Sequence, residues 1–95
     1  MLILMRTTHR LFFKPAQDMS AIADASVNEI ITSPPYPMIE MWDGILASQN
    51  ATFAEALHNG STDIAFEAAH QELDKVWKEC YRVLTSGGFL CINIG

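Results

Sequence analysis

Five consecutive residues, Thr32-Ser33-Pro34-Pro35-Tyr36, form the part of this chain that is best suited to chemistry. The two prolines fix φ and have no N–H, so we expect a stiff loop whose carbonyl oxygens stay free as acceptors. A serine oxygen and a proline carbonyl could then accept the two hydrogens of an exocyclic amine on a nucleobase. This contact would free the nitrogen lone pair for attack on a methyl sulfonium, while Tyr36 stacks on a base that has left the duplex.

The residues before this loop predict the strand that positions it. Residues 27–32 are β-branched or apolar except for Asn28 and Glu29, which is typical of a buried strand that ends at the loop. In α/β sheets, ligand chemistry collects beyond the carboxyl ends of strands. The expected position of the loop therefore supports a chemical role for it.

Two more apolar runs predict strands. Leu11-Phe12-Phe13 is short and is stopped by Pro15, which suits a brief strand. Residues 89–94 are nearly all apolar, which is typical of a strand covered on both faces of a parallel sheet. Three strands with helices between them predict an α/β fold with right-handed crossovers.

Helices are predicted between the second and third strands. Asn50 can cap a short helix through Leu57, and Asn59-Gly60 provides its stop. Residues 36–50 show no clean period, so no element is predicted there.

A longer helix is predicted from Ser61 or Thr62 to a stop at Gly87-Gly88. Its charged residues, from Glu72 to Arg82, are expected on the solvated face. Its apolar stripe consists of Leu73, Val76, Trp77, Cys80, Val83 and Leu84.

Composition describes a globular chain that cannot supply a DNA-binding surface alone. The hydrophobic share is 49%, the charged share is 18% and the net charge is −5. After Arg6, Arg10 and Lys14, the remaining residues carry three basic against eleven acidic side chains. Because phosphate contacts need clustered basic residues, most of any DNA groove must come from elsewhere.

Several other classes of protein are disfavoured. Cys80 and Cys91 lie in apolar surroundings, so we expect free thiols and a reducing, cytoplasmic setting. The histidines and cysteines lack metal-ligand spacing, so no metal is expected. The opening apolar run of five residues is shorter than a signal-peptide core or a membrane span, so no membrane partner is expected.

The segment from Thr32 to Tyr36 resembles the catalytic motif of amino-directed (N4-cytosine or N6-adenine) S-adenosylmethionine-dependent DNA methyltransferases. Its Ser-Pro-Pro-Tyr form resembles the N4-cytosine branch. The resemblance extends to residues 24–27, to residues 37–43 and to Arg82-Val83-Leu84 with the following glycines. It implies a partial Rossmann-like methyltransferase sheet of about three strands with flanking helices, S-adenosylmethionine as cofactor and DNA as substrate.

The same resemblance implies roles for single residues. Ser33 and the Pro34 carbonyl would orient and polarise the amine, Pro35 would stiffen the loop and Tyr36 would stack, which makes these four the candidate catalytic residues. Where the family often has Gly-Asp near the cofactor's adenine, this chain has Lys14-Pro15. Asp18 is the candidate substitute as a cofactor-binding residue, and its alternative role is that of a cap or turn residue.

The chain is similar to the N-terminal, catalytic-motif part of the permuted class of this family. The glycine-rich cofactor loop and the target-recognition region do not occur in residues 1–95. We therefore expect either a partner-dependent half of a split enzyme, an inactive truncated piece, or a chain that associates with itself. A restriction endonuclease is a further expected partner.

Two alternative enzymatic functions remain open at this point. An N6-adenine DNA methyltransferase would use the same chemistry, and a methyltransferase for RNA or for a protein amide can carry a related loop. Glu40, Trp42 and Asp43 could line a pocket for the target base, although Trp42 would serve equally well in core packing.

Overall fold

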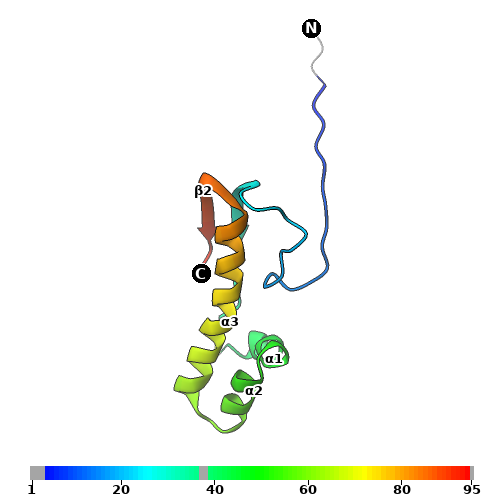
Figure 1. Ribbon diagram of the computed structural model, residues 1–95. Coiled ribbons are helices and arrows are strands. Elements are labelled where there is room, and N and C mark those ends of the chain that lie inside the picture. The colour runs from blue at the N-terminus through cyan, green and yellow to red at the C-terminus, as the bar shows by residue number, and fades with distance from the viewer. Residues whose placement is uncertain (1–3, 37–38, 95) are drawn as a thin grey trace.

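The computed structural model describes residues 4–36 and 39–94, and its regular elements are two parallel strands and three helices (Figure 1). Residues 1–3, 37, 38 and 95 lie outside the described part, including part of the apolar opening and of the predicted family-like flank at 37–43. The element order is β1 (Val27–Thr32), α1 (Glu40–Gln49), α2 (Ala51–His58), α3 (Thr62–Val83) and β2 (Leu84–Ile92). The predicted α/β class is confirmed.

Strand β1 has the predicted bounds and pairs in parallel with β2. Ile30 lies opposite Leu90 and Thr32 opposite Ile92. The predictions that residues 27–32 form a buried strand and that residues 89–94 are covered on both faces are wrong in this respect, because Ile31 is 75% and Phe89 69% exposed. The described part of the chain covers one face of the sheet and leaves the other open.

The predicted strand at residues 11–13 is also wrong. This segment runs as an extended arm away from the body of the molecule (Figure 1), and Leu11 and Phe13 are 80% and 95% exposed. A strand exists only where a neighbour accepts its backbone hydrogen bonds. Within the described residues, the two-stranded sheet is the only sheet, and this arm does not join it.

Helix α3 ends earlier than predicted, at Val83, and the two glycines lie inside β2. Its last carbonyls are satisfied by the segment before β1, since the Ala25 and Ser26 N–H groups donate to the Arg82 and Val83 oxygens at 2.9 and 2.8 Å. Gly87 has a φ of 81°, where a side chain would be strained. The glycines therefore shape an irregular start to the strand and do not stop the helix.

The helices before α3 include one that the sequence did not predict, α1. The cap of α2 is as predicted, because Asn50 Oδ1 accepts a hydrogen bond from the Phe53 N–H at 2.9 Å. The predicted stop of this helix is also confirmed, with Asn59 at its end and Gly60 at a φ of 72°.

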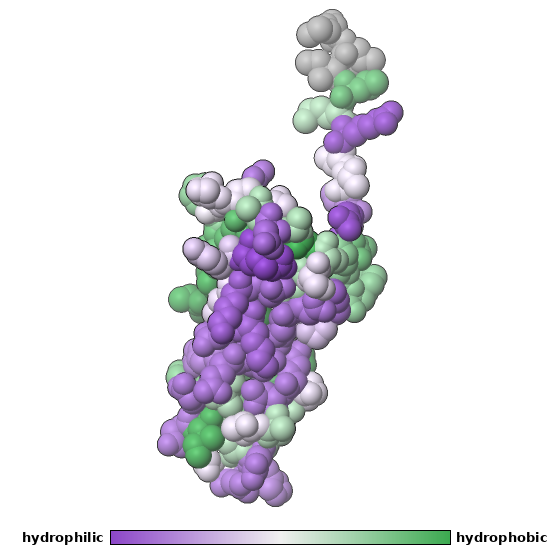
Figure 2. Space-filling model, viewed as in Figure 1, coloured by the Kyte–Doolittle hydropathy of each residue, from purple (hydrophilic) through white to green (hydrophobic). Residues whose placement is uncertain are grey.

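The hydrophobic core cluster lies among the three helices, and Leu73, Cys80 and Val83 of α3 are buried outside this cluster. Phe53 and Leu46 are 0% and 1% exposed, and small side chains of α3 pack against them; the cluster consists of Leu46, Phe53, Ala56, Ala65, Ala68 and Ala69. The outer surface of α3 is polar (Figure 2). Within the described residues, no helix combines the length and the apolarity that a membrane crossing requires.

Candidate active site

Residues 33–36, the proline loop, leave the sheet at the carboxyl end of β1, as predicted. The end of β2 holds the loop on both sides. The Asn93 N–H donates to the Thr32 carbonyl at 2.9 Å, and the Tyr36 hydroxyl donates to the Asn93 carbonyl at 3.2 Å. The proline loop is therefore tied to the ends of both parallel strands.

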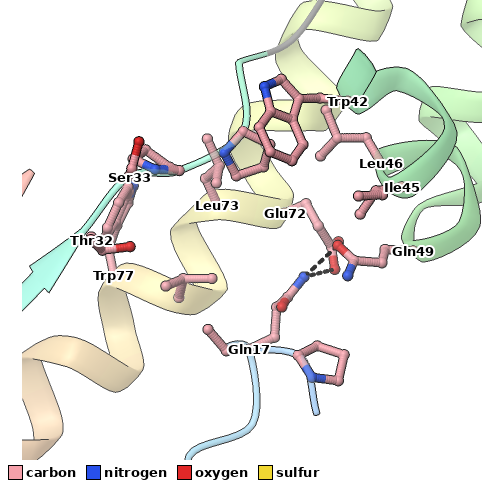
Figure 3. Close-up of a pocket in the computed structure, with 15 residues that line it drawn as sticks. Gln17, Thr32, Ser33, Trp42, Ile45, Leu46, Gln49, Glu72, Leu73 and Trp77 are labelled. Carbon is pink, nitrogen blue, oxygen red and sulfur yellow. Dashed lines mark hydrogen bonds between the residues drawn. The ribbon is translucent and has the colours of Figure 1, made fainter. Parts of the chain in front are cut away.

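A pocket of about 220 Å³ lies behind the proline loop, between α1 and α3 (Figure 3). Ser33, Pro34 and Pro35 form part of its wall, whereas Tyr36 does not. The helices add two indoles to the lining, Trp42 from α1 and Trp77 from α3. The further lining residues are Pro15, Ala16, Gln17, Thr32, Ile45, Leu46, Gln49, Glu72, Leu73 and Val76.

Glu72 is the one charged residue among the described residues that line this pocket. It is 5% exposed, so its predicted place on the solvated face of the helix is wrong. Gln17 Nε2 donates to its Oε1 at 3.0 Å, while Asn50 Nδ2 and Lys75 Nζ donate to its Oε2 at 3.3 and 2.8 Å. Figure 3 shows Gln17, Gln49 and Glu72 close together at one end of the pocket.

The hydrogen bonds to Glu72 also decide its charge. Burial, the largest single influence, raises the pKa of this carboxyl, but the hydrogen bonds from Lys75, Gln17 and Asn50 together outweigh burial and lower it. A buried carboxylate is tolerated only when it is paired and hydrogen-bonded, and this one is. Glu72 is therefore a carboxylate throughout the neutral range.

Arg82 joins the segment before β1 to the end of α3. Its guanidinium donates to Asp24 at 2.7 Å, to Glu79 at 2.9 and 3.0 Å, and to the carbonyls of Ile22 and Met19 at 2.9 and 2.8 Å. Hydrogen bonds to Glu79 and Asp24 raise the pKa of the guanidinium. The pattern at residues 82–84 thus has a structural role as well as its resemblance to a family motif.

Asp18 lies in a surface turn and not beside the proline loop. Its Oδ1 accepts the Ser20 N–H at 2.9 Å and its Oδ2 accepts Lys14 at 3.3 Å. Hydrogen bonds from Ser20 and then Lys14 lower its pKa to about 2. Both oxygens are engaged locally, so the assignment of Asp18 to the cofactor stays a prediction.

The structure separates the three candidates for a target-base pocket. Trp42 lines the pocket behind the proline loop, whereas Glu40 and Asp43 do not. Asp43 Oδ1 is buried, and no hydrogen-bond partner for it lies within the described residues. Among those residues, no group of three or more His, Cys, Asp or Glu side chains is arranged to hold a metal ion.

Sequence reasoning missed two participants in this site, Gln17 and Glu72. Gln17 lies 55 residues from its partner, and only the fold brings the two together. A signal for Glu72 was available in the helical period, because it directly precedes Leu73, the first residue of the apolar stripe. A charged residue at the margin of such a stripe can be drawn into the interior when donors meet it there.

Comparison with known proteins identifies the family. A family model for N6/N4 methyltransferases, described as DNA methylase, matches residues 27–95. Type II methyltransferase M.MthZI of Methanothermobacter thermautotrophicus is 44% identical over 92 residues, which are 96% of this chain and 26% of the relative. Type II methyltransferase M.MjaI of Methanocaldococcus jannaschii is 40% identical over 100 residues, which cover 94% of this chain and 33% of the relative.

The chain thus spans only about a quarter to a third of the length of these relatives. No solved structure matches it with comparable significance. The family model covers the proline loop, all three helices and both strands, and the predicted resemblance is confirmed. The chain belongs to the N6/N4 DNA methylase family.

Proposed function

We propose that this chain supplies the catalytic loop of a DNA methyltransferase that modifies the exocyclic amine of a flipped base, with cytosine N4 as the target. The observation that carries the proposal is the position of the Ser-Pro-Pro-Tyr segment at the carboxyl end of β1, held by the end of β2. Residues 1–95 are in this view the N-terminal portion of a catalytic domain with a partial Rossmann-like sheet. Family membership and the type II methyltransferase relatives support it.

The loop residues would act on the amine by orientation. The Ser33 oxygen and the Pro34 carbonyl accept the two amine hydrogens, which leaves the nitrogen lone pair directed outward. Pro35 holds this geometry because its φ is fixed. Tyr36 is held by its hydroxyl at Asn93, so its ring can present a face to the base. Attack on the methyl sulfonium would form the N–C bond as the methyl–sulfur bond breaks and the thioether leaves, and the amine proton would then pass to water.

S-adenosylmethionine would supply the methyl group. The residues described here do not by themselves make a site for it, because both oxygens of Asp18 are used within its own turn and the chain contains no glycine-rich cofactor loop. We therefore propose that the cofactor is held mainly by methyltransferase residues outside residues 1–95, which also provide most of the basic DNA surface. A restriction endonuclease of the same specificity is the further partner expected beside a type II methyltransferase.

A chimera tests the proposal. Residues 1–95 replace the matching region of M.MthZI, and methyl transfer to duplex DNA is measured with mass spectrometry of the product bases. We expect activity that Ser33→Ala lowers by about 10²-fold, the usual effect of removing one group aimed at the reacting centre. Ser86→Ala, at an exposed serine of β2, is the matched control. Full activity of the Ser33→Ala chimera would refute the role of the loop.

A second measurement tests whether residues 1–95 bind S-adenosylmethionine by themselves. Calorimetric titration of S-adenosylmethionine into the chain alone should give no heat of binding, whereas the chimera should bind. Binding by the chain alone would mean that it already contains the cofactor pocket. N4-methylcytosine in the chimera's product would support the proposed base, and N6-methyladenine would favour the alternative in the same family.

A further inference from the structure

A buried carboxylate joins three separate segments beside the proline loop. Glu72 on α3 accepts hydrogen bonds from Gln17 in the N-terminal segment and from Asn50 between α1 and α2. The Gln17 amide also donates to Gln49 Oε1 at 2.9 Å, at the end of α1. We call these four residues, Gln17, Gln49, Asn50 and Glu72, the carboxylate latch.

The latch determines how the walls of the pocket are placed. Gln49 and Asn50 lie at the end of the helix that carries Trp42, and Glu72 lies 5 residues before Trp77 on α3. Asn50 also caps α2 through the Phe53 N–H, so the same side chain connects the latch to the core. Because the latch couples α1 to α3, it sets the separation of the two indole-bearing walls (Figure 3).

The proline loop depends on these walls more than an ordinary loop would. Pro34 and Pro35 have no N–H and cannot be held by donating backbone hydrogen bonds. Thr32 and Tyr36, on either side, are bound to Asn93, but the prolines between them are placed by the surface that they face. That surface is the pocket shared with Trp42 and Trp77.

We infer that Glu72 is a positioning residue for the proline loop, acting through the carboxylate latch and the pocket walls. The importance of this for catalysis rests on the proposed function, whereas the positioning itself is a property of this chain. A buried ion pair is weak evidence for stability. The test must therefore separate the position of the loop from the stability of the fold.

The experiment compares chains of residues 1–95 by tryptophan emission and by amide hydrogen exchange at Asn93, whose N–H donates to the Thr32 carbonyl at the start of the proline loop. The chain contains two tryptophans, and both line the pocket, so the emission reports on its walls. Glu72→Gln leaves one oxygen for three donors and should speed exchange at the Asn93 amide by about tenfold or more, as expected when local order is lost. Glu67→Gln, at an exposed position of the same helix, should change neither readout.

A double variant that exchanges the amide of Gln17 and the carboxylate of Glu72 makes the test specific. Gln17→Glu alone places two carboxylates together and should also loosen the loop. Gln17→Glu combined with Glu72→Gln restores one amide and one carboxylate, and should recover most of the lost protection. Failure of the double variant to recover would overturn the inference, and so would an effect of Glu72→Gln no larger than that of Glu67→Gln.

Loss of the whole fold is distinguished by a milder variant. Gln17→Ala leaves Glu72 paired with Asn50 and Lys75. It should loosen the proline loop while amides in the core of α2 and α3 keep their protection. Equal acceleration at Asn93 and at Phe53 would make Glu72 a stabilising residue only and would overturn the inference. In the M.MthZI chimera, loss of activity with Ser33→Ala but not with Glu72→Gln would leave the proposed function standing without the latch.

Discussion

The helical body and the sheet of this chain bury their apolar side chains to very different extents. In the helical body, Leu46 and Phe53 are almost inaccessible to water. On the sheet, Ile31 and Phe89 are 75% and 69% exposed. Helices joined by short turns can cover one another within a short stretch of chain, whereas a parallel strand needs partners from distant sequence. Within the described residues, the helical body therefore covers its own apolar side chains, whereas the sheet does not.

The open face of the sheet is thus the strongest candidate for a contact surface. Contiguous exposed apolar side chains mark interaction sites in soluble proteins. Unpaired strand edges add backbone donors and acceptors that another polypeptide can use. We propose that this face is covered by methyltransferase residues outside residues 1–95, and that residues 1–95 taken alone associate with one another through it.

The largest expected contrast is in stability. Phe53→Ala removes a side chain that is 0% exposed and should lower the free energy of unfolding by about 3–5 kcal/mol, as aromatic deletions in cores do. Phe89→Ala should cost less than about 0.5 kcal/mol in the dissociated chain, because surface substitutions rarely cost more. Urea unfolding at low concentration measures both. Equal losses would mean that the sheet, and not the helical body, carries the stability.

The next contrast is in association. Light scattering of the unmodified chain should give a mass that rises with concentration. Ile31→Asp, on the open face, should weaken this association by about tenfold or more, because burying an isoleucine contributes about 1.5–3 kcal/mol. Ile64→Asp is the matched control, since this isoleucine is 51% exposed on the helical body. A compact monomer at all concentrations would contradict the assignment.

The smallest perturbation uses the two cysteines, one in each region. Cys80 is 1% exposed and burial raises the pKa of its thiol, whereas Cys91 is exposed on β2. With Ellman's reagent at neutral pH, Cys91 should react at once and Cys80 at least about a hundredfold more slowly, through opening of the fold. Cys91→Ser should remove only the fast phase. If both thiols reacted in one fast phase, the helical body would open readily.

The sequence correctly predicted the elements that depend on interactions between residues close together along the chain. The β-branched run of β1, the Asn50 cap and the start of α3 after Ser61 each depend on residues a few positions apart. The wrong predictions concern elements whose bounds depend on contacts between residues far apart in the sequence. Helix α3 ends at Val83 because Ala25 and Ser26 cap it, and residues 11–13 form no strand because no neighbour meets them in the described chain.

The sequence by itself determined the family, the α/β class and the position of the proline loop after β1, because a short motif and its adjacent strand lie together along the chain. Only the tertiary structure decided that Glu72 is buried, that Gln17 reaches it from 55 residues away, and that Tyr36 is held by Asn93. It also decided which face of the sheet stays open. These features depend on which segments meet in space, because a carboxylate is buried only where donors from other elements surround it.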